Sequence, residues 1–137
     1  MSNKLPTALL IAAGVCLTGL PASAHHSGAM FDRTHMITLD ATFMAQIYTN
    51  PHVWISVMGR PTGSKAKVVR WDIETVGPAN LTRVGITRET LKPGDKIKVK
   101  INPLRDGRNG GSLVSVTTSD GIERGFKGSP DESVAPE

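Results

Sequence analysis

The residues best suited to chemistry in this chain are its histidines, two of which stand side by side at His25-His26. They directly follow Ala22-Ser23-Ala24, which has the A-x-A pattern of a signal-peptidase site. Cleavage after Ala24 gives His25 a free α-amine beside its imidazole. Nitrogen donors of this kind favour Cu(II) among first-row divalent ions, with Zn(II) less favoured. A cut one or two residues earlier keeps the chelating terminus, because His25 then stands second or third in the mature chain.

His52 is the distant residue that fits such a site best. It follows Asn50-Pro51, where the proline restricts its own backbone and that of the residue before it. It also alternates with Val53, which places it on the polar face of an expected strand. We therefore predict a metal site, copper before zinc, formed by His25, His26 and His52. The alternative is an N-terminus that binds nothing and a His52 with a purely structural role.

Other polar groups have simpler structural interpretations. Asp72 and Glu74 stand two apart on an expected strand and so share a face, where surface pairing with Arg70 is the main expectation and completion of a metal site the alternative. His35 is expected in solvent. Trp71 is expected in the core. The four methionines of the mature chain are too scattered for a Cu(I) site and are expected in core gaps or on the surface.

The glycine-rich stretch 105–111 has the composition of a phosphate-binding loop but lacks the Lys-Ser/Thr ending of a P-loop and a following helix. It predicts a hairpin loop stabilised by Asp106 and the glycines. No nucleophile stands in a catalytic pattern, since the single cysteine, Cys16, lies in the signal segment. These residues favour a protein without catalytic activity. They do not exclude an enzyme, because a terminal-histidine copper site could be redox-active.

The elements that must position these residues are mostly strands. Alternating apolar and polar residues, broken by turn residues, predict strands at 37–48, 52–58, 68–76, 96–101 and 111–118. Pro78 at a first position and Gly85 past an end predict a short helix between the third and fourth strands. Three strands, a helix and two strands is the order of a small five-stranded OB-like barrel. The fold class is all-β with one short helix, and an open sandwich-like sheet is the alternative.

The chain divides into a targeting segment, one domain and a tail. Residues 1–24 read as a cleaved secretory signal peptide, with Lys4 before an apolar run that is shorter than the roughly 20 residues a membrane span needs. We place the cut within 22–25 and expect no stable membrane anchor after it. Residues 25–124 form the expected barrel, and 125–137 are an expected disordered tail. The expected location is periplasmic or secreted.

The charge and composition argue against nucleic acid as a partner. The net charge of +4 is spread along the chain without a basic stripe, and aromatic residues make up only 4%. Binding of single strands needs both a basic groove and stacking aromatics.

Short motifs along the chain resemble those of one family. They are Ala24-His25-His26-Ser27, Met30-Phe31-Asp32, Thr49-Asn50-Pro51-His52, Trp54, Trp71, Glu74, Pro78, Leu81, Gly85, Leu91-Lys92-Pro93-Gly94-Asp95, Pro103, Arg105-Asp106-Gly107, Gly110-Gly111 and Asp120-Gly121. In these the chain resembles the exported bacterial proteins grouped as domain of unknown function 6152, over residues 24–122. It departs from the pattern at Tyr48 and Ile86. The resemblance implies a periplasmic, mostly β protein and brings no assigned reaction.

Two functions therefore stay open from the sequence. The first is an exported binding or accessory protein that holds copper through His25, His26 and His52, with Phe31 anchoring the N-terminal segment to the barrel. The second is a barrel that binds a small molecule or another periplasmic protein and has no metal site. Both predict a binding surface on the outside of a small β domain.

Overall fold

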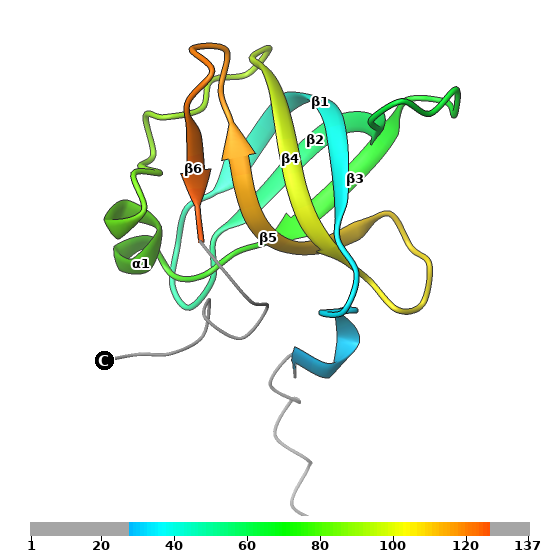
Figure 1. Ribbon diagram of the computed structural model, residues 1–137. Coiled ribbons are helices and arrows are strands. Elements are labelled where there is room, and N and C mark those ends of the chain that lie inside the picture. The colour runs from blue at the N-terminus through cyan, green and yellow to red at the C-terminus, as the bar shows by residue number, and fades with distance from the viewer. Residues whose placement is uncertain (1–27, 127–137) are drawn as a thin grey trace, which may run out of the picture.

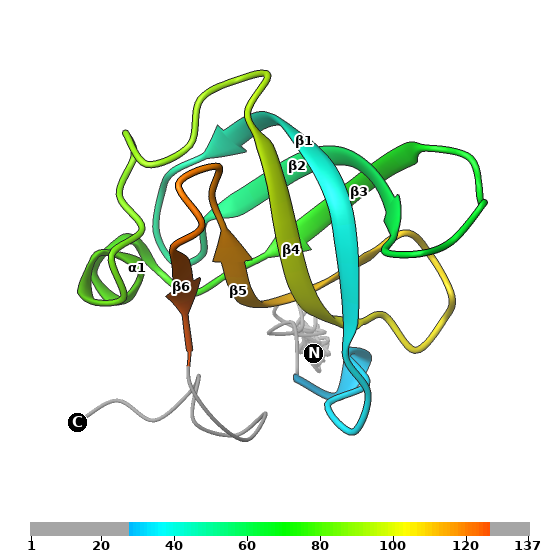
Figure 2. The same cartoon turned by 45° about the horizontal axis from the view of Figure 1, so that its top comes forward.

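Five strands wrap around one apolar interior in the computed structural model, which describes residues 28–126 (Figure 1). They are β1 (Ile37–Ile47), β2 (Trp54–Pro61), β3 (Val69–Glu74), β4 (Lys96–Pro103) and β5 (Gly110–Thr117). Neighbours pair antiparallel in the order β3-β2-β1-β4-β5, and a parallel pairing of β3 with β5 closes the barrel (Figure 2). The predicted five-stranded OB-like barrel is confirmed, and the open sheet is wrong.

Three smaller elements complete the described chain. A 3-10 turn, η1 (Gly28–Met30), precedes the barrel, and α1 (Pro78–Arg83) connects β3 to β4. A short strand that the sequence pattern did not predict, β6 (Glu123–Gly125), pairs with β5, and Phe126 packs against the core. The described chain thus runs two residues past the predicted domain end at 124. The predicted signal peptide and residues 127–137 of the predicted tail lie outside the described residues.

The core is built by side chains that alternate along the strands, as the period of two predicted. Buried residues at every second position of β2, β3 and β4 point inward, and Trp71 is among them. The indole Nε1 of Trp71 donates a hydrogen bond to the Gly59 carbonyl over 3.2 Å, so this buried polar group is satisfied. The prediction that Trp71 is the large aromatic of the core is confirmed.

Strand β1 follows its predicted alternation only as far as Phe43. Its pairing with β2 shifts by one residue between Phe43 and Ala45, which makes Met44 the extra residue of a β-bulge. The bulge reverses the faces beyond it, so Ile47, expected on the apolar face, is 64% exposed. Tyr48 packs against the core instead, and its hydroxyl donates toward carbonyls at the start and beyond the end of α1.

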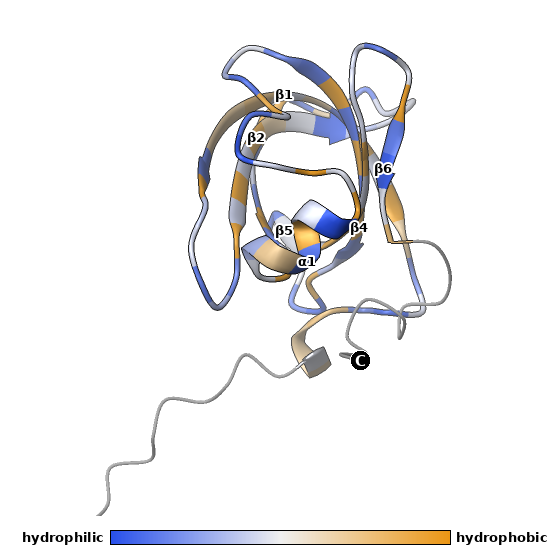
Figure 3. Cartoon of the chain, turned by 90° about the vertical axis from the view of Figure 1, so that its left-hand side faces the viewer, coloured by the Kyte–Doolittle hydropathy of each residue, from blue (hydrophilic) through white to orange (hydrophobic). Residues whose placement is uncertain are grey.

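The helix α1 lies across one opening of the barrel (Figure 3). Pro78 occupies its first turn, where a missing N–H costs nothing. Gly85 takes a positive φ of 81° just past its end and donates to the Thr82 carbonyl, which terminates the helix. Leu81 is fully buried and covers the core at this end.

Closure of the barrel depends on two glycines at the start of β5. A Cβ on Gly110 would lie 2.9 Å from the Asp72 carbonyl oxygen of β3. One on Gly111 would lie 2.5 Å from the Asn102 carbonyl oxygen of β4. Both distances are too short for real contacts, so glycine is what lets β5 approach both neighbours.

Candidate functional site

The histidine of the predicted site, His52, lies in the loop between β1 and β2. The Asn50–Pro51 peptide bond before it is cis. After it, Val53 exchanges backbone hydrogen bonds with Thr75 and Val76, which extends the β2–β3 ladder by one pair. Val53 is buried, so His52 stands on the outer face, as the alternation predicted.

On that face His52 contacts Glu74, the last residue of β3. Nδ1 of His52 lies 2.5 Å from Oε1 of Glu74. The contact turns the Nδ1 edge of the ring toward the carboxylate, although its alignment falls outside hydrogen-bond geometry. A proton on Nδ1 leaves the lone pair of the neutral imidazole on Nε2. Because the His52 side chain is 44% exposed, Nε2 can serve as a ligand atom.

The carboxylate of Glu74 is more deeply placed than the sequence predicted. The residue is only 5% exposed, so the expectation of a surface pair with Arg70 is wrong for Glu74. Its second oxygen, Oε2, is buried and has no hydrogen-bond donor among the residues that the structure describes. An unserved buried acceptor costs on the order of 1–3 kcal/mol, which makes this oxygen an exception in a well-formed fold.

Asp72 takes the predicted surface role instead. Its carboxylate accepts hydrogen bonds from Arg70 Nη2 at 2.9 Å and from Ser56 Oγ at 2.6 Å. Partial burial opposes ionisation, but these bonds and the charge of Arg70 outweigh it and lower the pKa of Asp72. The negative charge of Asp72 is therefore already compensated.

Glu74 and Asp72 line a groove where β3 meets β5, which we call the seam groove. Its volume is about 320 Å³. Trp54 lines it from β2, opposite Glu74 in the strand register, and Phe31 and Leu104 add apolar surface. Gly110 and Gly111 present bare backbone to it. The groove thus combines aromatic, aliphatic and carboxylate surface.

The segment that leads into the barrel is fixed beside this groove. Phe31 is buried and bridges to Leu104, so the prediction that Phe31 anchors the N-terminal segment is confirmed. Arg105 Nε donates to the carbonyls of Ala29 and Phe31, each over 3.1 Å. Met30 lines the seam groove directly. The chain that carries the two N-terminal histidines therefore enters the described domain at the groove that holds Glu74.

His25 and His26 themselves lie outside the described residues. From residue 28 to residue 126, no three histidine, cysteine, aspartate or glutamate side chains are gathered closely enough to hold a metal ion. His35 is exposed, as predicted. Met36 and Met44 are exposed and Met30 and Met58 half-buried, in agreement with surface and gap-filling roles.

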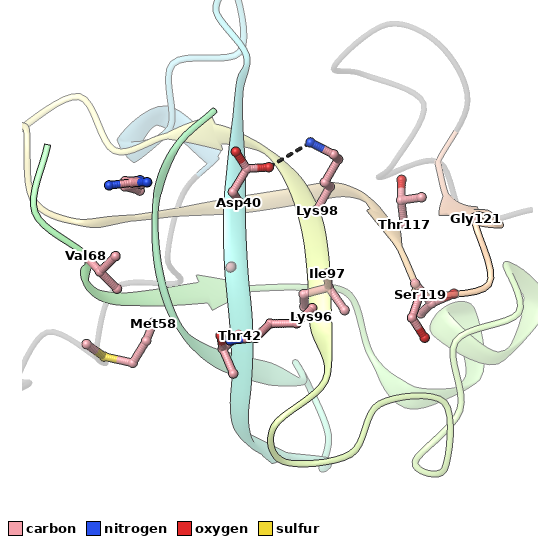
Figure 4. Close-up of a pocket in the computed structure, with 13 residues that line it drawn as sticks. Asp40, Thr42, Met58, Val68, Lys96, Ile97, Lys98, Thr117, Ser119 and Gly121 are labelled. Carbon is pink, nitrogen blue, oxygen red and sulfur yellow. Dashed lines mark hydrogen bonds and ion pairs between the residues drawn. The ribbon is translucent and has the colours of Figure 1, made fainter. Parts of the chain in front are cut away.

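A larger groove of about 620 Å³ runs along the outside of β1, β2 and β4 (Figure 4). We call it the β1–β4 groove. Lys98 Nζ pairs with Asp40 over 2.7 Å, and Lys96 Nζ donates to Thr42 over 2.7 Å. The hydrogen bond from Lys98 is the main reason that the pKa of Asp40 is lowered. These polar groups are satisfied by one another.

The loop between β4 and β5 has the predicted hairpin role. Asp106 accepts hydrogen bonds from the backbone and side-chain nitrogens of Arg108, which lower its pKa. Gly107 takes a positive φ of 78°. The predicted stabilisation of the loop by Asp106 and glycine is confirmed. Since Arg108 is held by Asp106, the cation at the rim of the seam groove is already paired.

Sequence reasoning missed the special place of Glu74. Alternation assigned it correctly to the outer face, but nothing in the pattern indicated that it would be buried there, in contact with His52 and opposite Trp54. The available signal was its position as the last residue of a strand, opposite an outward-facing tryptophan.

A comparison with protein-family models matches residues 13–114 to the Family of unknown function (DUF6152). The chain belongs to this family, as the resemblance of its motifs indicated. No curated protein and no solved structure shows a significant match to the chain. In the part of the chain that the structure describes, no helix has the length and apolar character needed to cross a bilayer.

Proposed function

We propose that this protein is an exported, periplasmic or secreted, binding protein that holds Cu(II) through His25, His26 and His52. The observation that carries the proposal is the contact of His52 Nδ1 with Glu74, which directs Nε2 outward. A carboxylate behind a histidine is the usual arrangement at metal sites, where it fixes the tautomer and orients the ring.

The N-terminal residues supply the remaining donors. Within the described residues His52 and Glu74 make a pair and no third donor joins them, so a metal site needs His25, His26 or the new α-amine. His25 stands three residues before Gly28, a span of at most about 11 Å. Met30, two residues further on, lines the groove that contains Glu74. Copper would require the donor nitrogens within about 4 Å of one another.

The decisive experiment uses protein exported and cut by its own signal. Mass spectrometry of the mature chain should give an N-terminus at or next to His25, and the protein should be found outside the cytoplasm. Cu(II) affinity and the electron spin-resonance spectrum are then compared for this protein, a form with Gly-Ser before His25, and His52→Ala. His35→Ala is the matched control, because His35 is an exposed histidine elsewhere.

Loss of an outer-sphere partner typically weakens metal binding about 10–100-fold, so loss of a direct ligand should weaken it at least tenfold. We expect that loss in the extended form and in His52→Ala, with a changed spectrum, and no loss in His35→Ala. Equal affinities in all four proteins would refute the copper site.

A further inference from the structure

The seam groove is lined by Glu74, of which the copper proposal uses only one carboxylate oxygen. Glu74 directs Oε1 toward His52, but Oε2 is buried without a hydrogen-bond donor among residues 28–126. The residue lines the groove and is 95% buried. A ligand that reaches this carboxylate from the groove would supply the donor that no residue from 28 to 126 provides.

The charges around the groove determine which charge a ligand should carry. Asp72 is compensated by Arg70, and Arg108 by Asp106 at 2.7 Å. Among residues 28–126, the ion pair of Glu74 is with the imidazole of His52. The uncompensated charge at the groove is therefore negative, and the paired Arg108 offers little to an anion.

The remaining lining selects an organic cation over a bare metal ion. Trp54 presents an indole, and an aromatic face attracts ammonium groups. Phe31, Leu104 and Met30 form an apolar wall that suits a hydrocarbon body. At about 320 Å³ the groove lies at the small end of ligand sites.

We propose that the seam groove binds a small primary amine in its ammonium form. The ammonium group donates to Oε2 of Glu74, and the apolar body of the ligand lies against Phe31 and Leu104 beside Trp54. This site is separate from the copper ligands, which share with it only the carboxylate behind His52.

The test uses metal-free protein, cut natively, with phenethylammonium as the probe and phenethyl alcohol as its uncharged control. Binding is followed by the Trp54 indole signal in NMR spectra and by calorimetry. We expect a dissociation constant on the order of 1 mM or tighter for the amine. The alcohol cannot form the charge-assisted hydrogen bond of the amine, so it should bind at least about tenfold more weakly.

Variants then assign the interaction to Glu74. Glu74→Gln should weaken amine binding about tenfold or more, whereas Asp40→Asn, which removes a carboxylate from the β1–β4 groove, should leave it unchanged. His52→Ala separates the two proposals, because it should weaken copper binding at least tenfold and leave amine binding as tight or tighter.

Three results would overturn the amine site. One is equal binding of amine and alcohol to the unchanged protein, a comparison that needs no variant to fold. Another is unchanged amine affinity in a folded Glu74→Gln, which would mean that water serves Oε2. The third is the absence of any shift of the Trp54 signal at a phenethylammonium concentration about ten times the expected dissociation constant.

Discussion

The two grooves of this barrel differ in how their polar groups are satisfied. The β1–β4 groove is about twice the volume of the seam groove, at 620 against 320 Å³. Its lysines are engaged by Asp40 and Thr42. The seam groove is smaller, but it holds a buried carboxylate oxygen that no described residue serves.

Under the amine proposal, unmet hydrogen-bonding capacity and not size distinguishes the binding groove from the other one. Exposed ion pairs such as Lys98–Asp40 contribute little to stability, because solvent screens them, and they can form on any polar surface. A buried, unserved oxygen opposes folding by a larger amount. We propose that a ligand of the seam groove offsets the cost of burying Glu74 Oε2.

The strongest way to disturb the seam groove alone is to separate the strands that form it. In Gly110→Ala the new Cβ would lie 2.9 Å from the Asp72 carbonyl oxygen of β3 and 2.9 Å from Leu104 Cδ1. Overpacking of this kind costs about 1–3 kcal/mol, and here it strains backbone at the barrel closure. We expect a decrease of about 2–3 kcal/mol in the free energy of unfolding, measured by urea denaturation.

Gly28→Ala is the control for this substitution. A Cβ at Gly28 meets only the end of the flexible Arg33 side chain, which can move away. Its effect should stay within about 0.5 kcal/mol. A Gly110→Ala protein as stable as Gly28→Ala would show that the β3–β5 closure tolerates a side chain.

The second prediction compares one carboxylate from each groove. Glu74→Leu removes a buried charge and its unserved oxygen and leaves an apolar side chain of similar size, while the half-exposed His52 can turn to water. Replacing buried charges by apolar residues is often neutral or stabilising, and we expect about 1 kcal/mol of added stability in the unliganded protein. Asp40→Leu, in the β1–β4 groove, should instead lose a small amount because Lys98 loses its partner. Thermal unfolding of the two variants shows whether each substitution raises or lowers stability. A destabilised Glu74→Leu would contradict the cost assigned to Oε2.

The alternation of residue types was enough to predict the barrel and the outward position of His52. It failed at Met44 because a bulge inserts one residue without any change in composition, and the faces reverse from there on. Alternation also cannot say what covers an outer face. Glu74 was correctly placed outside, yet it is buried beside His52 and Trp54, which the pairing of β2 with β3 brings to it and which alternation within β3 cannot indicate.

The smallest expected effect concerns the acid stability of the β1–β4 groove. The pKa of Asp40 is lowered in the folded protein, first by the hydrogen bond from Lys98. A lowered carboxyl pKa contributes stability above the unfolded value, which is about 3.8, and that contribution is lost as the pH falls through the folded value. Asp40→Asn should therefore reduce stability slightly near neutrality and flatten the decline below about pH 4.

Asp120 is the reference carboxylate for this measurement, because it lines neither the β1–β4 groove nor the seam groove. Hydrogen bonds from Thr118, Arg124 and the Ile122 backbone hold its pKa far below the usual range. Asp120→Asn should thus flatten the acid decline more than Asp40→Asn does, when urea unfolding is compared at pH 7 and pH 3. If Asp40→Asn flattened the acid decline more than Asp120→Asn, the pairs of the β1–β4 groove would stabilise the fold more than exposed surface contacts do.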